Sequence, residues 1–102
     1  MPQFLVTIYD GTDAQAPARR QATRTAHLEG LKGNVASGKV VFGGRIFDDS
    51  QQPVGSFLMA DCADRAELDA MIANDPYTKG NVWQRVEVKP VQLVVHDGKI
   101  TP

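Results

Sequence analysis

The chain has 102 residues, of which 11 are Lys or Arg and 12 are Asp or Glu, so its formal net charge is -1 at pH 7. Because neither sign forms a run, the sequence lacks the basic patch typical of nucleic-acid binding, and we expect no nucleic-acid partner. The length fits one domain spanning residues 1–102, since roughly 150 residues per domain are typical.

The sequence opens with MPQFLVTIYDG, which has neither the basic segment nor the long apolar stretch of a targeting sequence. No segment approaches the roughly 18 consecutive apolar residues of a membrane span. We therefore expect a cytoplasmic protein without membrane association. Cys62 is the only cysteine, so we predict no intramolecular disulfide and no cysteine-based zinc site, and we expect a buried or half-buried thiol.

The first elements in chain order are a strand and a long helix. β-branched and aromatic residues predict the strand at residues 3–9, bounded by Asp10-Gly11. The pattern then changes, and a helix is predicted over residues 14–38. Its inward stripe is expected at spacings of four, three and four residues: Arg24, Leu28, Leu31 and Val35.

Two more strands are predicted at residues 39–47 and 54–61, joined as an antiparallel hairpin by the polar turn DDSQQP. Gly43 and Gly44 interrupt the first of them, which indicates a bulge or a backbone that another group approaches closely. A second helix follows, capped by Asp64 and Glu67, and Pro76 ends it. Residues 82–95 alternate as a last strand, in which Pro90 marks an edge, a bulge or a bend.

The order β-α-β-β-α-β predicts an α+β fold of the ferredoxin-like type, an antiparallel sheet with two helices on one face. The first strand places Phe4, Val6 and Ile8 on one side and Leu5, Thr7 and Tyr9 on the other. Because two helices can cover only one apolar face, we predict a homodimer formed by stacking the open sheet faces. The sequence does not decide whether such dimers associate into a larger oligomer.

Arg24 and His27 lie one helical turn apart at the border of the predicted stripe, facing a groove. A histidine beside an apolar wall can act as a general acid or base, and an arginine there can hold an anionic group. The alternative is purely structural: a histidine hydrogen-bonded at the helix border and an arginine that covers it with its aliphatic stem.

The segment NDPYTKG supplies a second set of candidates, because Asp75 is fixed before a proline and Tyr77 can line a pocket with a rigid ring. An ordinary turn carboxylate at a helix stop is the alternative. Gly43 and Gly44 would let a ligand approach strand backbone. Asp48, Asp49 and Asp61 lack the spacing of a known metal loop, so no metal site is predicted, and His96 is expected in a tail or turn.

Together, RTAHLEGL, SGKVVFGG, NDPYTKGNV and VEVKPV, in this order, resemble the YCII-related (YciI-like) family over nearly the whole chain. The resemblance implies a dimeric α+β barrel, relatedness to muconolactone-isomerase-like proteins, and a cleft in which a histidine, here His27, works with an aspartate. By motif, the family's Asp-Pro-Tyr residues are Asp75, Pro76 and Tyr77, and its arginine is Arg24.

Two departures from the family pattern bear on the site. Many relatives have an acidic residue just before the glycine that ends the first helix, where this chain has Ala36-Ser37 before Gly38. Asp75 is then the remaining motif candidate for a carboxylate partner of His27. The usual Gly-Pro of the second strand is replaced by Gly43-Gly44.

The resemblance implies cofactor-independent acid–base chemistry (elimination, isomerisation or hydrolysis) on a small, cyclic, anionic metabolite, since a dehydrochlorinase acting on a chlorinated aromatic ring belongs to the family. In this hypothesis His27 transfers the proton and Asp75 orients or charges the imidazole of His27. The substrate is bound by Arg24, Tyr77, Gly43 and Gly44. The alternatives are a non-catalytic module that binds a small molecule in the dimer cleft and a dimeric accessory domain without a ligand.

Overall fold

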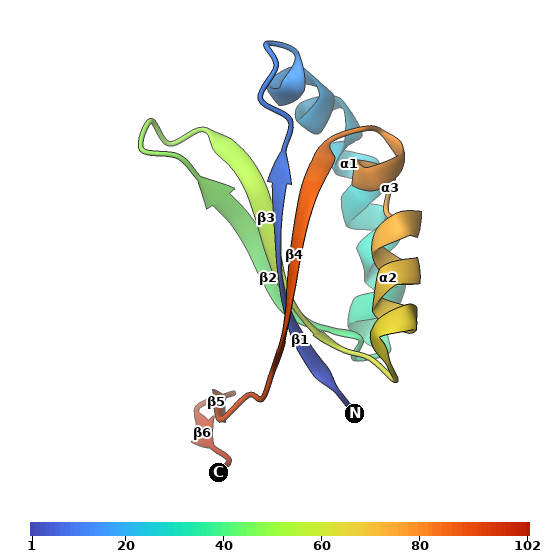
Figure 1. Cartoon of the computed structure of the whole chain (residues 1–102), viewed down its shortest axis with the longest axis vertical. Helices are drawn as coiled ribbons and strands as arrows, with labels where there is room; N and C mark the ends of the chain where they lie inside the picture. Colours follow the sequence, from blue (N-terminus) through green and yellow to red (C-terminus); the bar gives the residue numbers. More distant parts are fainter.

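The computed structural model describes residues 1–102. Three helices lie on one face of a four-stranded sheet, and a small two-stranded hairpin projects beyond the sheet at the C-terminal end (Figure 1). The elements are β1 (Gln3–Asp10), α1 (Ala16–Ala36), β2 (Val40–Phe47), β3 (Pro53–Asp61), α2 (Arg65–Asn74), α3 (Pro76–Lys79), β4 (Trp83–Val91), β5 (Val95–His96) and β6 (Lys99–Ile100).

The main sheet has the order β2-β3-β1-β4, and every neighbouring pair is antiparallel. With its helices on one face, this is the α+β ferredoxin-like arrangement that the sequence predicts. Pro90 lies in β4, which pairs only with β1, so the proline occupies an edge strand where its missing N–H costs no ladder bond. The β5–β6 hairpin and the one-turn helix α3 were not predicted.

The hydrophobic core lies between the sheet and the helices. Strand alternation places Phe4, Val6 and Ile8 of β1 on the covered face, and all three are buried. α2 covers them with Leu68 and Ile72, each buried, and burying such a side chain contributes about 1.5–3 kcal/mol. Cys62 joins this cluster, as expected of the lone thiol.

The predicted stripe of α1 is confirmed only in part, because Leu31 packs against the core while its neighbours in the stripe are more exposed. Leu28 and Val35 are 44% and 55% exposed, whereas Arg20 and His27 are buried. The two buried residues are seven positions apart, two helical turns, and so lie on one side of the helix. This polar side turns inward because other elements supply partners for both residues.

No helix of the chain is both long and apolar enough to cross a membrane.

The opposite face of the sheet carries no helix (Figure 1). Leu5 is 37% exposed there, and Thr7, Tyr9 and Phe57 are half-buried. The register places Leu5 opposite Met59 and Thr7 opposite Phe57, which joins them into one surface across β1 and β3. We call this surface the open sheet face.

Candidate active site

A cavity of about 370 Å³ lies between α1 and the strands β2 and β3. Hydrophobic side chains make up 10 of the 17 residues that line it. The other seven are Gly43, Gly44 and five polar or charged residues, none of them a carboxylate: Arg20, Arg24, His27, Arg45 and Ser56. We call this cavity the cleft. Its lining is typical of a small-molecule pocket, mostly apolar with a few converging polar groups.

His27 and Asp75 meet at the inner end of the cleft. The sequence left open whether the fold brings them together; in the structure His27 Nδ1 lies 2.8 Å from Asp75 Oδ1. Because an ionised carboxylate only accepts hydrogen bonds, Nδ1 carries the proton of this contact. Asp75 is not part of the cleft lining, so the carboxylate lies behind the ring. Nε2 has no hydrogen-bond partner in the chain and is the ring nitrogen left for a ligand.

Asp75 is held in place by the turn between α2 and α3. Its extended backbone, with φ -68° and ψ 136°, ends α2 before Pro76. Its Oδ1 also accepts from the backbone N–H of Tyr77 at 2.8 Å and thereby caps α3. The carboxylate that orients the imidazole is therefore fixed by local backbone geometry.

Two aromatic rings hold the imidazole from its sides. Tyr77 stacks on His27 with ring centroids 3.9 Å apart and an interplanar angle of 13°. Trp83 meets the imidazole edge-on at 5.3 Å. Burial raises the pKa of Tyr77 above its usual value of 10.0, so its ring is a neutral phenol at physiological pH. Tyr77 can therefore pack and hydrogen-bond in this site, but it is no base.

A buried ion pair supports the cleft from β1. Arg20 Nη1 donates to both carboxylate oxygens of Asp10 at 2.9 Å, and the two side chains are only 6% and 5% exposed. Arg20 Nη2 donates to Ser56 Oγ at 3.0 Å. Since Asp10 compensates its charge, Arg20 is a structural donor rather than a free cation.

Arg24 and Arg45 stand at the mouth of the cleft, Arg24 on α1 and Arg45 on β2. Both are exposed, and neither forms an ion pair. Arg45 lies over the ring of Phe47, 5.1 Å from its centroid. With two uncompensated cations and no carboxylate in its lining, the cleft has a positive potential that favours anionic ligands.

Gly43 and Gly44 line the cleft wall on β2. A Cβ added at Gly43 would lie 2.8 Å from the carbonyl oxygen of Phe57, and one at Gly44 would lie 2.9 Å from the Phe57 ring. The group that approaches these glycines closely is thus the neighbouring strand β3. The pairing of β2 with β3 is irregular between Val40 and Phe42, just before the glycines. Their contact with a ligand stays a prediction.

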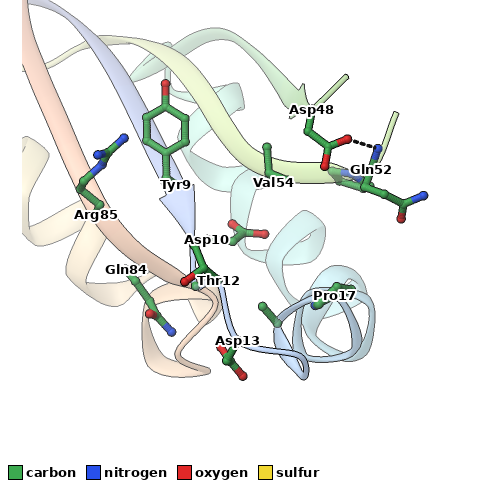
Figure 2. Close-up of a pocket in the computed structure, with 13 residues that line it drawn as sticks. Tyr9, Asp10, Thr12, Asp13, Pro17, Asp48, Gln52, Val54, Gln84 and Arg85 are labelled. Carbon is green, nitrogen blue, oxygen red and sulfur yellow. Dashed lines mark hydrogen bonds between the residues drawn. The ribbon is translucent and has the colours of Figure 1, made fainter. Parts of the chain in front are cut away.

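A second, larger cavity of about 590 Å³ lies at the end of β1 next to the β2–β3 turn (Figure 2). Its charged groups are already engaged within the chain. Asp13 pairs with Arg19, Asp48 accepts from the backbone of Gln52, and Arg85 lies over the ring of Tyr9. It contains no histidine, so the cleft is the better candidate for acid–base chemistry.

Nowhere in the chain are three His, Cys, Asp or Glu side chains grouped so as to hold a metal ion.

Sequence reasoning missed four polar residues of the cleft and its support: Asp10, Arg20, Arg45 and Ser56. Trp83, whose Nε1 donates to Ser56 Oγ at 3.1 Å, was missed as well. Helical spacing could have found Arg20, because it precedes Arg24 by one turn on the line that leads to His27. The strand residues gave no comparable signal.

Comparison with known proteins identifies relatives of this arrangement. Residues 2–92 match the model of the YCII-related domain. The 5-chloro-2-hydroxyhydroquinone dehydrochlorinase of Burkholderia phenoliruptrix, solved in complex with 2,5-dihydroxybenzoquinone, is 25% identical with a TM-score of 0.76, over 88% of this chain and 93% of that one. A dimeric ferredoxin-like protein from a Jannaschia species is 12% identical with a TM-score of 0.53, over 91% of this chain and 100% of that one, a likeness of fold alone. No curated protein matches the chain.

Proposed function

The chain belongs to the YCII-related domain family, and from the geometry of its cleft we propose that it is a cofactor-independent acid–base enzyme acting on a small, cyclic, anionic metabolite. The contact between His27 Nδ1 and Asp75 Oδ1 carries this proposal, because it leaves Nε2 of a residue that lines the cleft without a partner in the chain. Proton transfer by a positioned histidine typically contributes about 10²- to 10⁴-fold in rate. Elimination and isomerisation, which need one shuttled proton, fit best; hydrolysis by an activated water is the third option.

In the proposed step, neutral His27 accepts a proton from a substrate carbon at Nε2. The electron pair of the broken C–H bond forms a new double bond, and either a leaving group departs or charge moves onto a conjugated oxygen. Asp75 stays ionised and accepts from Nδ1–H, which favours the imidazolium that forms. The stacked ring of Tyr77 keeps the imidazole from rotating.

The substrate class follows from the lining of the cleft. Tyr77, Trp83 and aliphatic side chains offer flat apolar walls for a ring. Arg24 and Arg45 favour a negative charge at the mouth. The dehydrochlorinase neighbour, whose structure contains a cyclic quinone, supports this class at 25% identity.

The test uses His27→Ala and Asp75→Asn in an assay of chloride release from 5-chloro-2-hydroxyhydroquinone, the compound named for the neighbour. Both variants should lose turnover while the matched control His96→Ala, on the distant β5, keeps it. Binding of 2,5-dihydroxybenzoquinone is followed by the fluorescence of Trp83, the only tryptophan. Full turnover by His27→Ala contradicts the mechanism. Binding without any turnover in the unmodified protein instead supports the non-catalytic binding module.

We further propose that two copies stack their open sheet faces. The exposed Leu5 and the half-buried Phe57 support this, because no element of the same chain covers them. Leu5→Glu places a charge at the centre of the face and should convert a dimer to a monomer in light-scattering measurements. Thr25→Glu, on the exposed side of α1, is the control. A monomer at micromolar concentration in the unmodified protein contradicts the proposal.

A further inference from the structure

Ser56 is a buried hydroxyl with an unusual hydrogen-bond balance. It lies on β3, is 5% exposed and lines the cleft together with His27. Its Oγ accepts two hydrogen bonds, from Arg20 Nη2 at 3.0 Å and from Trp83 Nε1 at 3.1 Å. Guanidinium and indole N–H groups can only donate, so Oγ is the acceptor in both contacts.

A hydroxyl has two acceptor lone pairs and one proton to donate. Both lone pairs of Ser56 Oγ are occupied, yet its proton has no acceptor within the chain. Ser56 forms no hydrogen bond with Asp10, the carboxylate that Arg20 also binds. A buried donor without a partner is costly, and because Ser56 lines the cleft, a ligand bound there can supply the missing acceptor.

We propose that Ser56 is a ligand-binding residue whose hydroxyl donates to an anionic oxygen of the bound ring, an enolate or phenolate type of group. The inference rests on the proposed function, because the oxygen it serves is the one that becomes negative when His27 removes a proton from a neighbouring carbon. Arg20 and Trp83 fix the hydroxyl in this donating orientation. Their N–H bonds to Oγ also polarise it, which strengthens the hydrogen bond that it gives.

Substituted phenols test this directly, because they carry the proposed oxygen without any proton transfer from carbon. Binding of 4-nitrophenolate and of nitrobenzene, which lacks the oxygen, is measured by Trp83 fluorescence and by the absorbance of the phenolate. The unmodified protein should bind the phenolate more tightly. Ser56→Ala should lose at least about tenfold of phenolate affinity, the range for a hydrogen bond to a charged group, with nitrobenzene affinity unchanged.

Ser56→Thr keeps the hydroxyl and should restore the phenolate preference. The charge of Arg24 and Arg45 also favours the phenolate, so the comparison is repeated at high salt, which screens these exposed cations far more than a direct hydrogen bond. If Ser56→Ala is too unstable to measure, Ser56→Cys, with a weaker donor of similar size, should give an intermediate preference.

The inference is overturned if the unmodified protein shows no preference for the phenolate, or if Ser56→Ala weakens both ligands equally. His27→Ala separates it from the proposed function. That variant should abolish turnover while leaving the preference for phenolate over nitrobenzene in place. Loss of the preference in Ser56→Ala together with normal turnover in His27→Ala would uphold the oxygen subsite and refute the histidine mechanism.

Discussion

Arg19 and Arg20 are neighbours in α1, yet one lies at the surface and the other is buried. Arg20 is buried against Asp10 at the inner end of the cleft, whereas Arg19 pairs with Asp13 at the surface, where the side chains are 27% and 51% exposed. The same contrast divides the cleft itself. Its inner end is built from buried groups whose charges are compensated or whose side chains are held by hydrogen bonds, and its mouth carries the exposed, unpaired Arg24 and Arg45. The inner end thus holds its side chains in fixed positions, whereas the charges at the mouth are free to attract anions.

The largest expected effect tests the buried pair. Asp10→Ala leaves the Arg20 guanidinium buried without a counter-charge and should lower the free energy of unfolding by about 3–5 kcal/mol. Asp13→Ala removes the partner of Arg19 in the same way, but water then solvates the exposed guanidinium. Urea unfolding of both variants checks this. Equal losses would show that burial is not what separates the two pairs.

Asp75→Asn tests the charge behind the imidazole of His27. The amide oxygen can take the place of Oδ1 and accept from Nδ1–H, but it lacks the negative charge that stabilises the imidazolium formed in the proposed step. We expect about a 10²-fold loss in kcat with little loss of stability, because the amide oxygen can still accept from the N–H of Tyr77. Asp49→Asn, in the exposed β2–β3 turn, is the control. An unchanged kcat would assign Asp75 to helix capping alone.

At the mouth, Arg24→Gln and Arg45→Gln should each raise KM by about two- to fivefold and leave kcat unchanged, as expected for exposed charges worth up to about 1 kcal/mol. The effect should shrink as salt is added. Arg65→Gln, which removes a cation of α2 remote from the cleft, controls for net charge. A drop in kcat would place either arginine among the groups that touch the reacting atoms.

The smallest effect concerns the surface pair. The hydrogen bond from Arg19 lowers the pKa of Asp13 from 3.8 to about 2. A depressed folded-state pKa stabilises the protein above the unfolded value, and this contribution disappears as the pH falls from 3.8 toward about 2. Asp13→Asn should therefore flatten the acid limb of the stability curve in that window only. A difference between the variants that persists unchanged at the lowest pH would contradict this assignment.

Alternation and turn residues were sufficient to predict the sheet, since Phe4, Val6 and Ile8 are buried as a period of two requires. The same reasoning described α1 only in part, because the predicted stripe lines the cleft while its most buried polar residues, Arg20 and His27, lie beside it. Their partners come from other elements. His27 and Asp75 are 48 positions apart, and no local spacing reveals such a contact. Helical position and the Asp-Pro turn had nominated the two residues separately, and only the motif resemblance paired them, while Ser56 had no signal at all.

Asp75 links the candidate site to the shortest helix of the fold. One oxygen atom receives both the backbone N–H that starts α3 and the imidazole of His27. A helix of four residues frays more readily than the sheet beneath it. Warming should therefore release the imidazole while the strands are still intact, so thermal inactivation precedes global melting.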